Sequence, residues 1–341
     1  MEPGLIASGS YDKTIRIWRK PRRLFTFRGV GNLRPFLEVL KFLSPEEVIG
    51  VARVNKQFYE ASFHSEVPKP EFRQTKVLKG DAGWVYSIVV FLKKGILVSG
   101  GSDSTIQVWN LATGEITQVL KGHSNWVWSV AISSDGKWAV SGSLDKTLRV
   151  WNLAFGKTTL VLKGHSNGVS SVAISNKDQH IVSGSFDKTL RVWSLTGGKK
   201  IRVLRGHSDL VRSVVISKSD QYIVSGSDDS TVRVWSFKDL IRVLKGHGGI
   251  IYSVAISSNE QFVVSGSADR TIRVWSLTSG ETTQVLRGHT GRVLSVNLSS
   301  DDKHLVSGSN YRSVGVWDLS TGLQTQELKG HAGEVWSVKI I

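Results

Sequence analysis

Serine, histidine and aspartate, the three residue types of a hydrolase triad, recur along this sequence at fixed spacing. A Ser-Gly-Ser-x-Asp-x-Thr motif leads to Val-Trp in Ser141–Trp151, and a Gly-His pair precedes it at His123. The same arrangement returns around Ser183–Trp193, Ser225–Trp235 and Ser265–Trp275. A catalytic triad occurs once in a chain and is placed by the fold, whereas this combination occurs once per repeat. We therefore predict a structural role for these residues, no catalytic residue and no enzyme.

The motif repeats with a period near forty residues. Its closing tryptophans are 42 residues apart from Trp109 to Trp235, then 40 and 42 apart up to Trp317. Such a period is typical of stacked supersecondary units. One unit holds four short segments rich in Val, Ile, Trp and Thr, at Thr117–Leu120, Val127–Ile132, Trp138–Ser141 and Thr147–Trp151. Each unit is expected to form a four-stranded sheet, and radial stacking of such sheets predicts an all-β propeller.

Composition narrows the function further. The 341 residues include no cysteine, which excludes a disulfide framework and a Cys-based metal site or nucleophile. No His cluster has the spacing of a metal site, so we expect neither metal nor cofactor. No apolar run approaches the length of a membrane span, and repeat sequence follows Met1 almost directly, which argues against a signal peptide. These features favour a protein of the cytoplasm, the nucleus or both.

The formal net charge is +16, which raises the possibility of an acidic partner. Much of this charge belongs to the repeat, since one basic residue precedes each Gly-His pair and another precedes Val-Trp. The second series is Arg149, Arg191, Arg233 and Arg273. Charges repeated once per unit are expected to form a solvated basic periphery, which disfavours a dedicated nucleic-acid or membrane-surface site.

These repeats resemble WD40 repeats over nearly all of the chain except about residues 19–71. In that family the Gly-His histidine, a serine, the turn aspartate and the tryptophan form a buried hydrogen-bonded set. The resemblance carries this role to His123, Ser141, Asp145 and Trp151; to His165, Ser183, Asp187 and Trp193; to His207, Ser225, Asp229 and Trp235; and to His247, Ser265, Asp269 and Trp275. In two repeats Gly80-Asp81 replaces Gly-His and Asn310-Tyr311 replaces the x-Asp pair.

Counting repeats predicts seven blades. In the family the fourth strand of a blade comes from the start of the following repeat, so six blades run from Trp84 to Leu328. The remaining fragments, Glu334–Ile341 and Leu5–Trp18, are one strand and two strands. Joined, they form a seventh blade that closes the ring and removes two exposed sheet edges. Its buried set is His331, Ser8, Asp12 and Trp18.

The closing blade carries an insertion. Trp18 and Trp109 are 91 residues apart where one period is expected. We assign residues 1–18 to the closing blade, 19–71 to an inserted segment with its core at 32–68, and 72–341 to the remaining blades. The insertion falls between the third and fourth strands of its blade. Apolar residues at helical spacing and the helix start Ser44-Pro45-Glu46-Glu47 predict a small α-helical segment.

The segment from Val39 to Tyr59 resembles an F-box. In that family this segment binds a Skp-type adaptor of a cullin–RING ubiquitin ligase. The match departs from the usual pattern at Leu33-Arg34-Pro35 and at Asn55. The expected adaptor-binding residues are Leu33, Phe36, Leu37, Leu40, Leu43, Pro45, Val48, Ile49, Phe58 and Tyr59. The alternative is a purely structural insertion that packs on the propeller.

WD40 propellers bind peptides on the face that carries the second–third and fourth–first strand connections. Carried over position by position, the expected partner-binding residues are Trp84, Tyr86, Trp126, Trp128, Arg212, Tyr252, Arg292 and Trp336. Five of these aromatic residues belong to three successive blades, which suggests an apolar or cation-bearing peptide. Arg212 and Arg292 are not on neighbouring blades, which disfavours a phosphopeptide.

Two functions fit these features. The first is the substrate receptor of an F-box-type ubiquitin ligase, which would hold the adaptor through the insertion and the substrate through the propeller. The second is a non-catalytic scaffold with a structural insertion. Binding of a Skp-type adaptor separates the two.

Overall fold

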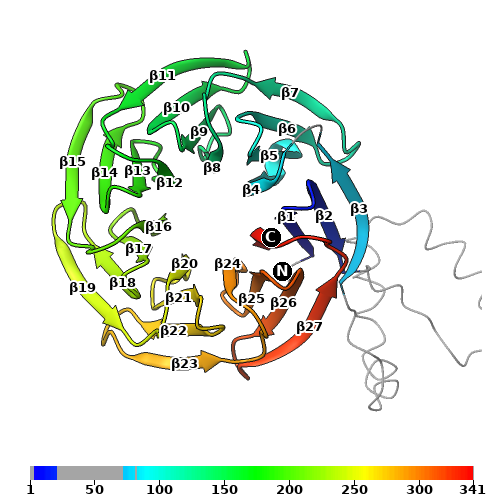
Figure 1. The fold of residues 1–341 in the computed structure, drawn as a ribbon, viewed down its shortest axis with the longest axis vertical. Coiled ribbons are helices and arrows are strands. Elements are labelled where there is room, and N and C mark those ends of the chain that lie inside the picture. Colours follow the sequence, from blue (N-terminus) through cyan, green and yellow to red (C-terminus); the bar gives the residue numbers. More distant parts are fainter. Residues whose placement is uncertain (1–3, 21–71, 81–82, 341) are drawn as a thin grey trace, which may run out of the picture. The chain divides into compact units, whose positions relative to one another are not determined.

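The computed structural model describes residues 4–20, 72–80 and 83–340. The chain divides into two compact units, one formed by Met1–Arg19 and Phe72–Ile341 and the other by Lys20–Glu71. The predicted helical segment and all of its expected adaptor-binding residues lie outside the described residues. The first unit is a ring of seven four-stranded antiparallel sheets, which confirms the predicted seven-bladed propeller (Figure 1).

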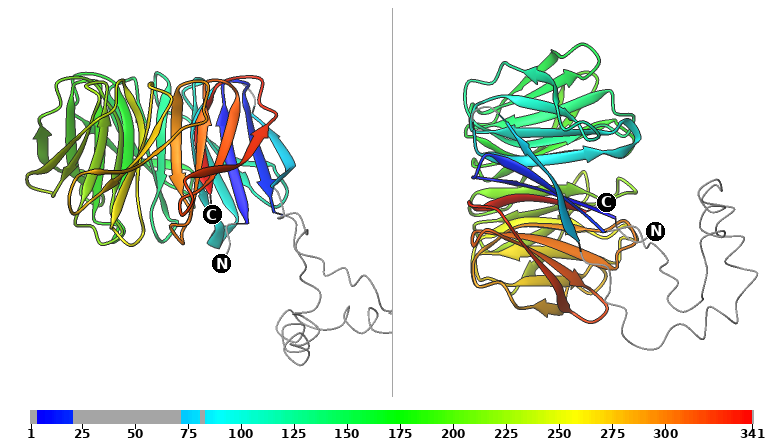
Figure 2. Two further views of the ribbon diagram at one scale, coloured as in Figure 1. Left: turned by 90° about the horizontal axis from the view of Figure 1, so that it is seen from below. Right: turned by 90° about the vertical axis from the view of Figure 1, so that its right-hand side faces the viewer.

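Each blade has four strands, which we name a to d from the channel outward. Strand b pairs with a and c, and strand c pairs with d. Figure 1 shows strands a around the central axis and strands d on the rim, and Figure 2 shows the ring edge-on. The closing blade consists of β28 (Val335–Ile340), β1 (Leu5–Ser10), β2 (Thr14–Arg19) and β3 (Arg73–Lys79).

The other blades follow in chain order. The second and third blades are β4 (Val85–Phe91), β5 (Ile96–Gly101), β6 (Ile106–Asn110) and β7 (Ile116–Leu120), then β8 (Val127–Ile132), β9 (Trp138–Ser143), β10 (Thr147–Asn152) and β11 (Lys157–Lys163). The fourth and fifth are β12 (Val169–Ile174), β13 (His180–Ser185), β14 (Thr189–Ser194) and β15 (Lys200–Arg205), then β16 (Val211–Ile216), β17 (Ile223–Ser227), β18 (Thr231–Trp235) and β19 (Leu240–Lys245). The sixth and seventh are β20 (Ile251–Ile256), β21 (Phe262–Ser267), β22 (Ile272–Ser276) and β23 (Thr282–Leu286), then β24 (Val293–Leu298), β25 (His304–Ser309), β26 (Ser313–Asp318) and β27 (Leu323–Lys329). A short 3₁₀ turn, η1 (Leu92–Lys94), joins β4 to β5.

The closing blade joins the two ends of the chain as predicted. Strand β28 pairs with β1 from Ile6↔Ile340 to Ser10↔Val335. Strand β2 ends at Arg19, whose Cα partner on β3 is Arg73, so the segment between them departs from the c–d turn and returns to it. Phe72 is buried beside Ile6 and Trp18, and its backbone N–H and C=O both bond the carboxamide of Gln326.

Neighbouring blades interlock through glycine and serine. Each Ser-Gly-Ser glycine of strand b lies against the first valine or isoleucine of strand a in the next blade; a Cβ added at Gly142 would lie 2.6 Å from Val169 Cγ1. The serine at the third position of strand a accepts a hydrogen bond from a backbone N–H of the next blade. These serines are Ser87, Ser129, Ser171, Ser213, Ser253, Ser295 and Ser337, one in every blade. The series therefore runs around the entire ring.

Candidate functional site

The repeated Ser, His, Asp and Trp residues form a directed chain of hydrogen bonds. In the third blade Trp151 Nε1–H donates to Ser141 Oγ at 2.8 Å, and His123 lies 2.7 Å from both Ser141 Oγ and Asp145 Oδ2. If the His123 Nδ1–H donates to the carboxylate, then Nε2 accepts from the serine hydroxyl. This order is that of a catalytic triad. Ser141 is fully buried, however, so no substrate can reach its hydroxyl, and the set is structural.

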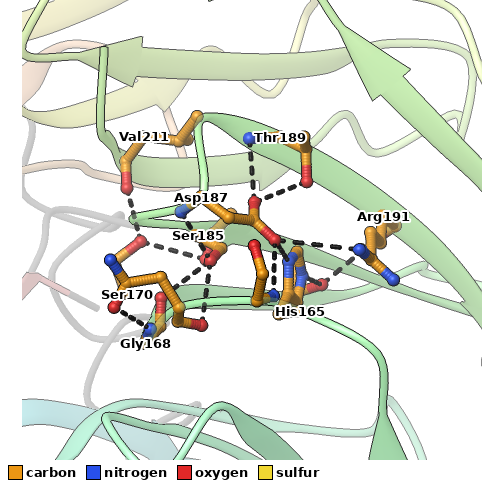
Figure 3. Close-up of polar contacts among 12 residues, drawn as sticks. His165, Gly168, Ser170, Ser185, Asp187, Thr189, Arg191 and Val211 are labelled. Carbon is orange, nitrogen blue, oxygen red and sulfur yellow. Dashed lines mark hydrogen bonds and ion pairs between the residues drawn. The ribbon is translucent and has the colours of Figure 1, made fainter.

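The turn aspartate is the centre of each set. Figure 3 shows Asp187, which accepts from His165 Nδ1 at 2.7 Å and from both the backbone N–H and the hydroxyl of Thr189. Ser185 Oγ accepts from the Asp187 N–H and donates to the Gly168 carbonyl, while Arg191 approaches the same carboxylate at 3.8 Å. The turn Thr and the second Ser of Ser-Gly-Ser therefore belong to the set as well. Sequence analysis did not assign them a role, although both repeat with the motif.

Burial and hydrogen bonding set the charge states of the His–Asp pairs. Burial raises the pKa of Asp187, but hydrogen bonds from His165 and Thr189 outweigh it and hold the pKa well below its ordinary value. Burial lowers the pKa of His165, which its hydrogen bond to Asp187 opposes only in part. The same directions hold for His207 with Asp229. At neutral pH these two pairs thus consist of a neutral imidazole and a carboxylate.

The structure places the His–Ser–Asp contacts of the other predicted sets in the same way, but in the closing blade no hydrogen bond is described from Trp18 to Ser8. In the fifth and sixth blades, His207 bonds Ser225 and Asp229, and His247 bonds Ser265 and Asp269, at 2.7 to 2.8 Å. Trp193, Trp235 and Trp275 each donate to the serine of their own blade. In the closing blade His331 bonds Ser8 at 2.7 Å and Asp12 at 2.9 Å, and its ring lies 5.8 Å from that of Trp18.

Two blades have incomplete sets. In the second blade Trp109 still donates to Ser99, but Asp81 lies outside the described residues. In the seventh blade His289 bonds Ser307, while Tyr311 stands where the aspartate would be and is 64% exposed. Without that carboxylate, burial lowers the pKa of His289 to about 4.

A ring of seven side chains surrounds the end of the central channel. They are the second residues of strands a, one from each blade: Tyr86, Trp128, Ser170, Arg212, Tyr252, Leu294 and Trp336. They line an open pocket, which we call the channel mouth. The b–c turns and d–a connections lie at this end of the blades, which we call the mouth face. Five of the eight predicted partner-binding residues belong to this ring.

Two three-ring stacks cover one side of the mouth face. Tyr11 is stacked between Trp84 and Trp336, with ring centroids 4.6 and 5.3 Å away. Tyr86 is stacked between Trp126 and Trp128, at 5.7 and 4.5 Å. The two tyrosines meet edge to face at 5.5 Å, so both Trp–Tyr–Trp stacks form one aromatic cluster. Burial raises the pKa of Tyr11 to about 12, and the tyrosine therefore stays neutral.

This cluster changes two expectations. Tyr11 and Phe186, which were not among the predicted binding residues, belong to it; Phe186 contacts Trp128 edge to face at 5.9 Å. Their position before the turn aspartate was the available signal. In addition, both faces of Tyr11 and Tyr86 are occupied by indole rings. A ligand cation needs a free ring face, so a cation-bearing peptide would have to use the partly exposed outer indoles, Trp84 and Trp126, and not these tyrosines.

The arginines also differ from expectation. Arg212 and Arg292 come from the fifth and seventh blades, yet both approach Tyr252 of the sixth, at 5.9 Å from Arg212 Cζ to the ring and 3.5 Å from Arg292 Nη1 to the hydroxyl. The arginines before Val-Trp are not part of a solvated periphery. Arg191 is buried, and Arg149 and Arg273 lie within 6 Å of the tryptophan rings of their blades. Their charge is used inside the blades, against aromatic rings and the turn carboxylates.

In the described part of the chain, no helix is long and apolar enough to cross a membrane. No group of three or more His, Asp or Glu side chains there is placed to hold a metal ion.

Comparison with protein families agrees with this architecture. The family model of the WD domain, G-beta repeat, matches seven segments, at residues 3–19, 72–110, 114–152, 156–194, 198–236, 238–276 and 280–318. Among curated proteins, no significant match was found. Propellers of this type are protein-interaction modules, and the matched segments cover well over half of the sequence. The chain therefore belongs to the WD40, or G-beta repeat, family.

Proposed function

We propose that this protein binds an extended peptide across the mouth face. The observation that carries the proposal is the aromatic cluster, whose two outer indoles, Trp84 and Trp126, remain 39% and 37% exposed. Rigid, partly exposed Trp and Tyr side chains are the usual anchors of protein interfaces. Because the rings already hold one another in place, they lose little conformational freedom when a partner binds.

Selection from a random peptide library, followed by fluorescence polarisation with a selected peptide, tests this proposal. Trp84→Ala and Trp126→Ala should each weaken binding about tenfold or more, as truncation of an aromatic anchor does. Phe155→Ala is the matched control, because Phe155 is 75% exposed in the turn between β10 and β11, at the opposite end of its blade. A selected peptide that binds the natural protein and all three variants equally would overturn the proposal.

A finer proposal concerns the inserted segment. We propose that residues 32–68 bind a Skp-type adaptor, which would make the chain the substrate receptor of an F-box-type ubiquitin ligase acting by proximity. The F-box resemblance supports this proposal. So does the place of insertion: the segment is attached at Arg19 and Phe72, in a c–d turn, whereas the aromatic cluster lies at the b–c end of the blades.

Co-elution with a purified Skp-type adaptor tests the finer proposal. The protein should form a complex, and Leu40→Asp combined with Phe58→Asp should abolish it while the circular dichroism of the propeller is unchanged. A folded protein that forms no complex would leave the alternative, a non-catalytic scaffold whose insertion has a structural role. Peptide binding at the mouth face would be unaffected by that result.

A further inference from the structure

Tyr252 joins two arginines at the channel mouth. The Cζ atom of Arg212 lies 5.9 Å from the Tyr252 ring centroid, and Arg292 Nη1 lies 3.5 Å from the Tyr252 hydroxyl. Strands β16, β20 and β24 follow one another around the ring, so the three residues form one continuous group across three blades. The sequence does not reveal this group, because Arg212 is the second residue of β16 whereas Arg292 directly precedes β24.

Arg212 is held in place before any ligand binds. Its Nε and Nη2 bond both oxygens of Asp228 at 2.7 Å, and its guanidinium lies 5.0 Å from the Phe186 ring centroid. The side chain is 21% exposed. The third nitrogen, Nη1, makes no hydrogen bond with any described residue. Arg292 is exposed, and the one hydrogen bond that its side chain makes within the described chain is the long contact to Tyr252. Both guanidinium groups therefore keep unused N–H donors.

The mouth contains hydrogen-bond donors that have no partner among the described residues. Asp228 already accepts twice from Arg212, and Glu334 accepts from Trp336 Nε1 at 3.0 Å. The indole N–H of Trp128, which also lines the mouth, is buried without a hydrogen-bond partner in the described structure. A buried donor without a partner is costly, so a ligand that supplies an acceptor oxygen gains at this position.

We propose that the channel mouth binds a carboxylate side chain, Asp or Glu, of the bound peptide between Arg212 and Arg292. The local charge favours a ligand with a single negative charge. Asp228 and Glu334 already stand at the mouth, where they bond Arg212 and Trp336, so a doubly charged group meets more repulsion there than a carboxylate does. A phosphoryl group carries nearly two negative charges at neutral pH and would be matched less well. This inference rests on the proposed function and specifies the chemistry of its ligand, an acidic residue followed or preceded by apolar residues that reach the aromatic cluster.

The test uses four immobilised nonapeptide mixtures, random at eight positions and carrying Glu, Gln, phosphoserine or Lys at the fifth. Retention of the full-length protein is measured by biolayer interferometry. The Glu mixture should retain the protein about five- to tenfold better than the Gln mixture, as expected for charge-assisted hydrogen bonds at a partly exposed site. The Lys mixture should retain the protein least, and the phosphoserine mixture should retain it less than the Glu mixture.

Three variants link the preference to these residues. Arg292→Gln changes an exposed side chain and should reduce Glu retention to the Gln level. Asp228→Asn keeps an acceptor for Arg212 but removes its charge, so it should increase Glu retention. Lys200→Gln, on the exposed edge of β15, removes the same charge elsewhere and should leave the order of the mixtures unchanged.

The outcomes separate this inference from the proposed function. Equal retention on Glu and Gln, still lost in Trp84→Ala, would overturn the carboxylate site and leave peptide binding standing. A Glu preference that survives Trp84→Ala and Trp126→Ala would support the site and contradict the aromatic anchors. Strongest retention on phosphoserine would overturn the choice of a single charge, and no retention on any mixture would overturn both proposals.

Discussion

Ser337 Oγ accepts a hydrogen bond from the backbone N–H of Ile88 at 3.1 Å. Ser337 lies on the last strand of the chain, and Ile88 lies on the first strand after the closing blade. The same bond joins every other pair of adjacent blades, for example Val254 N–H to Ser213 Oγ at 3.2 Å. The junction between the closing blade and the second blade is therefore built like the junctions between the other blades, and no blade interface is left unbonded along this series.

Removing this hydroxyl should weaken the closure by a measurable amount. Ser337→Ala leaves the Ile88 N–H without its acceptor in a largely buried position, which costs about 1–3 kcal/mol. Ser213→Ala is the matched variant, because it removes the same bond at an internal junction. Thermal unfolding followed by circular dichroism should show that both variants have their unfolding midpoint lowered by similar amounts. A large effect of Ser213→Ala beside none of Ser337→Ala would show that the closing junction is not held in this way.

The Ser-Gly-Ser glycine is required by its distance to the next blade. A Cβ at Gly142 would lie 2.6 Å from Val169 Cγ1 and 2.9 Å from Val172 Cγ1. Gly142→Ala should therefore push the third and fourth blades apart and lower stability by about 1–3 kcal/mol, as overpacking does. Gly142→Ala combined with Val169→Ala removes the nearest obstacle. The double variant should lose less stability than the sum of the losses of Gly142→Ala and Val169→Ala measured singly. A loss equal to that sum would contradict the steric explanation.

The fold was largely predictable because each sequence repeat specifies one four-stranded blade. The period of the tryptophans, together with the strand order that the WD40 resemblance implies, predicted the number of blades, and the unmatched fragments at the two ends predicted the closure. Both predictions depend on local sequence and counting. The serine series around the channel was not predicted, although the serine recurs at the third position of strand a in every blade. Its role depends on which blade lies beside it in space.

The site was predictable only in part for the same reason. The positions of Trp84, Tyr86, Trp126, Trp128 and Trp336 around the mouth followed from the repeat alignment. Which rings stack on one another depends on side-chain geometry across blades, so the central place of Tyr11 was missed. The grouping of Arg212 and Arg292 around Tyr252 was missed because the two arginines belong to blades that are not adjacent.

Removing the inserted segment should leave the propeller folded. Arg19 and Arg73 are Cα partners on β2 and β3, so a short glycine-rich turn in place of Lys20–Glu71 can join the strands. Because loop length contributes only weakly to stability, the thermal midpoint should change by only a few degrees. Peptide binding at the mouth face should persist, while any adaptor binding is lost.

The residue at the edge of that deletion provides its control. Phe72 is buried against Trp18 and Leu328, and Gln326 bonds its backbone twice. In the shortened protein, Phe72→Ser should lower stability by about 3 kcal/mol or more, because it removes a buried aromatic ring. If the shortened protein with Phe72 intact fails to fold, the two units are not independent, which would contradict the expectation.

The seventh blade should respond to pH through His289. Burial lowers the pKa of this imidazole to about 4 from its ordinary 6.5. Between these values the unfolded chain binds more protons than the folded one, so stability is full above pH 6.5 and falls as the pH drops toward 4. Tyr311→Asp places a carboxylate where Asp145 stands beside His123, and this carboxylate should raise the pKa of His289.

Thermal midpoints at pH 7.5 and pH 5 test this expectation. Tyr311→Asp should gain about 1 kcal/mol at pH 7.5 from the added hydrogen bond, because Tyr311 is 64% exposed and its loss costs little packing. It should also lose less stability than the natural protein on going to pH 5, since its His289 accepts a proton more readily in the folded state. Tyr311→Asn has nearly the same shape without the charge and should keep the natural pH dependence. If the Asp and Asn variants respond to pH alike, the missing carboxylate is not what lowers the pKa of His289.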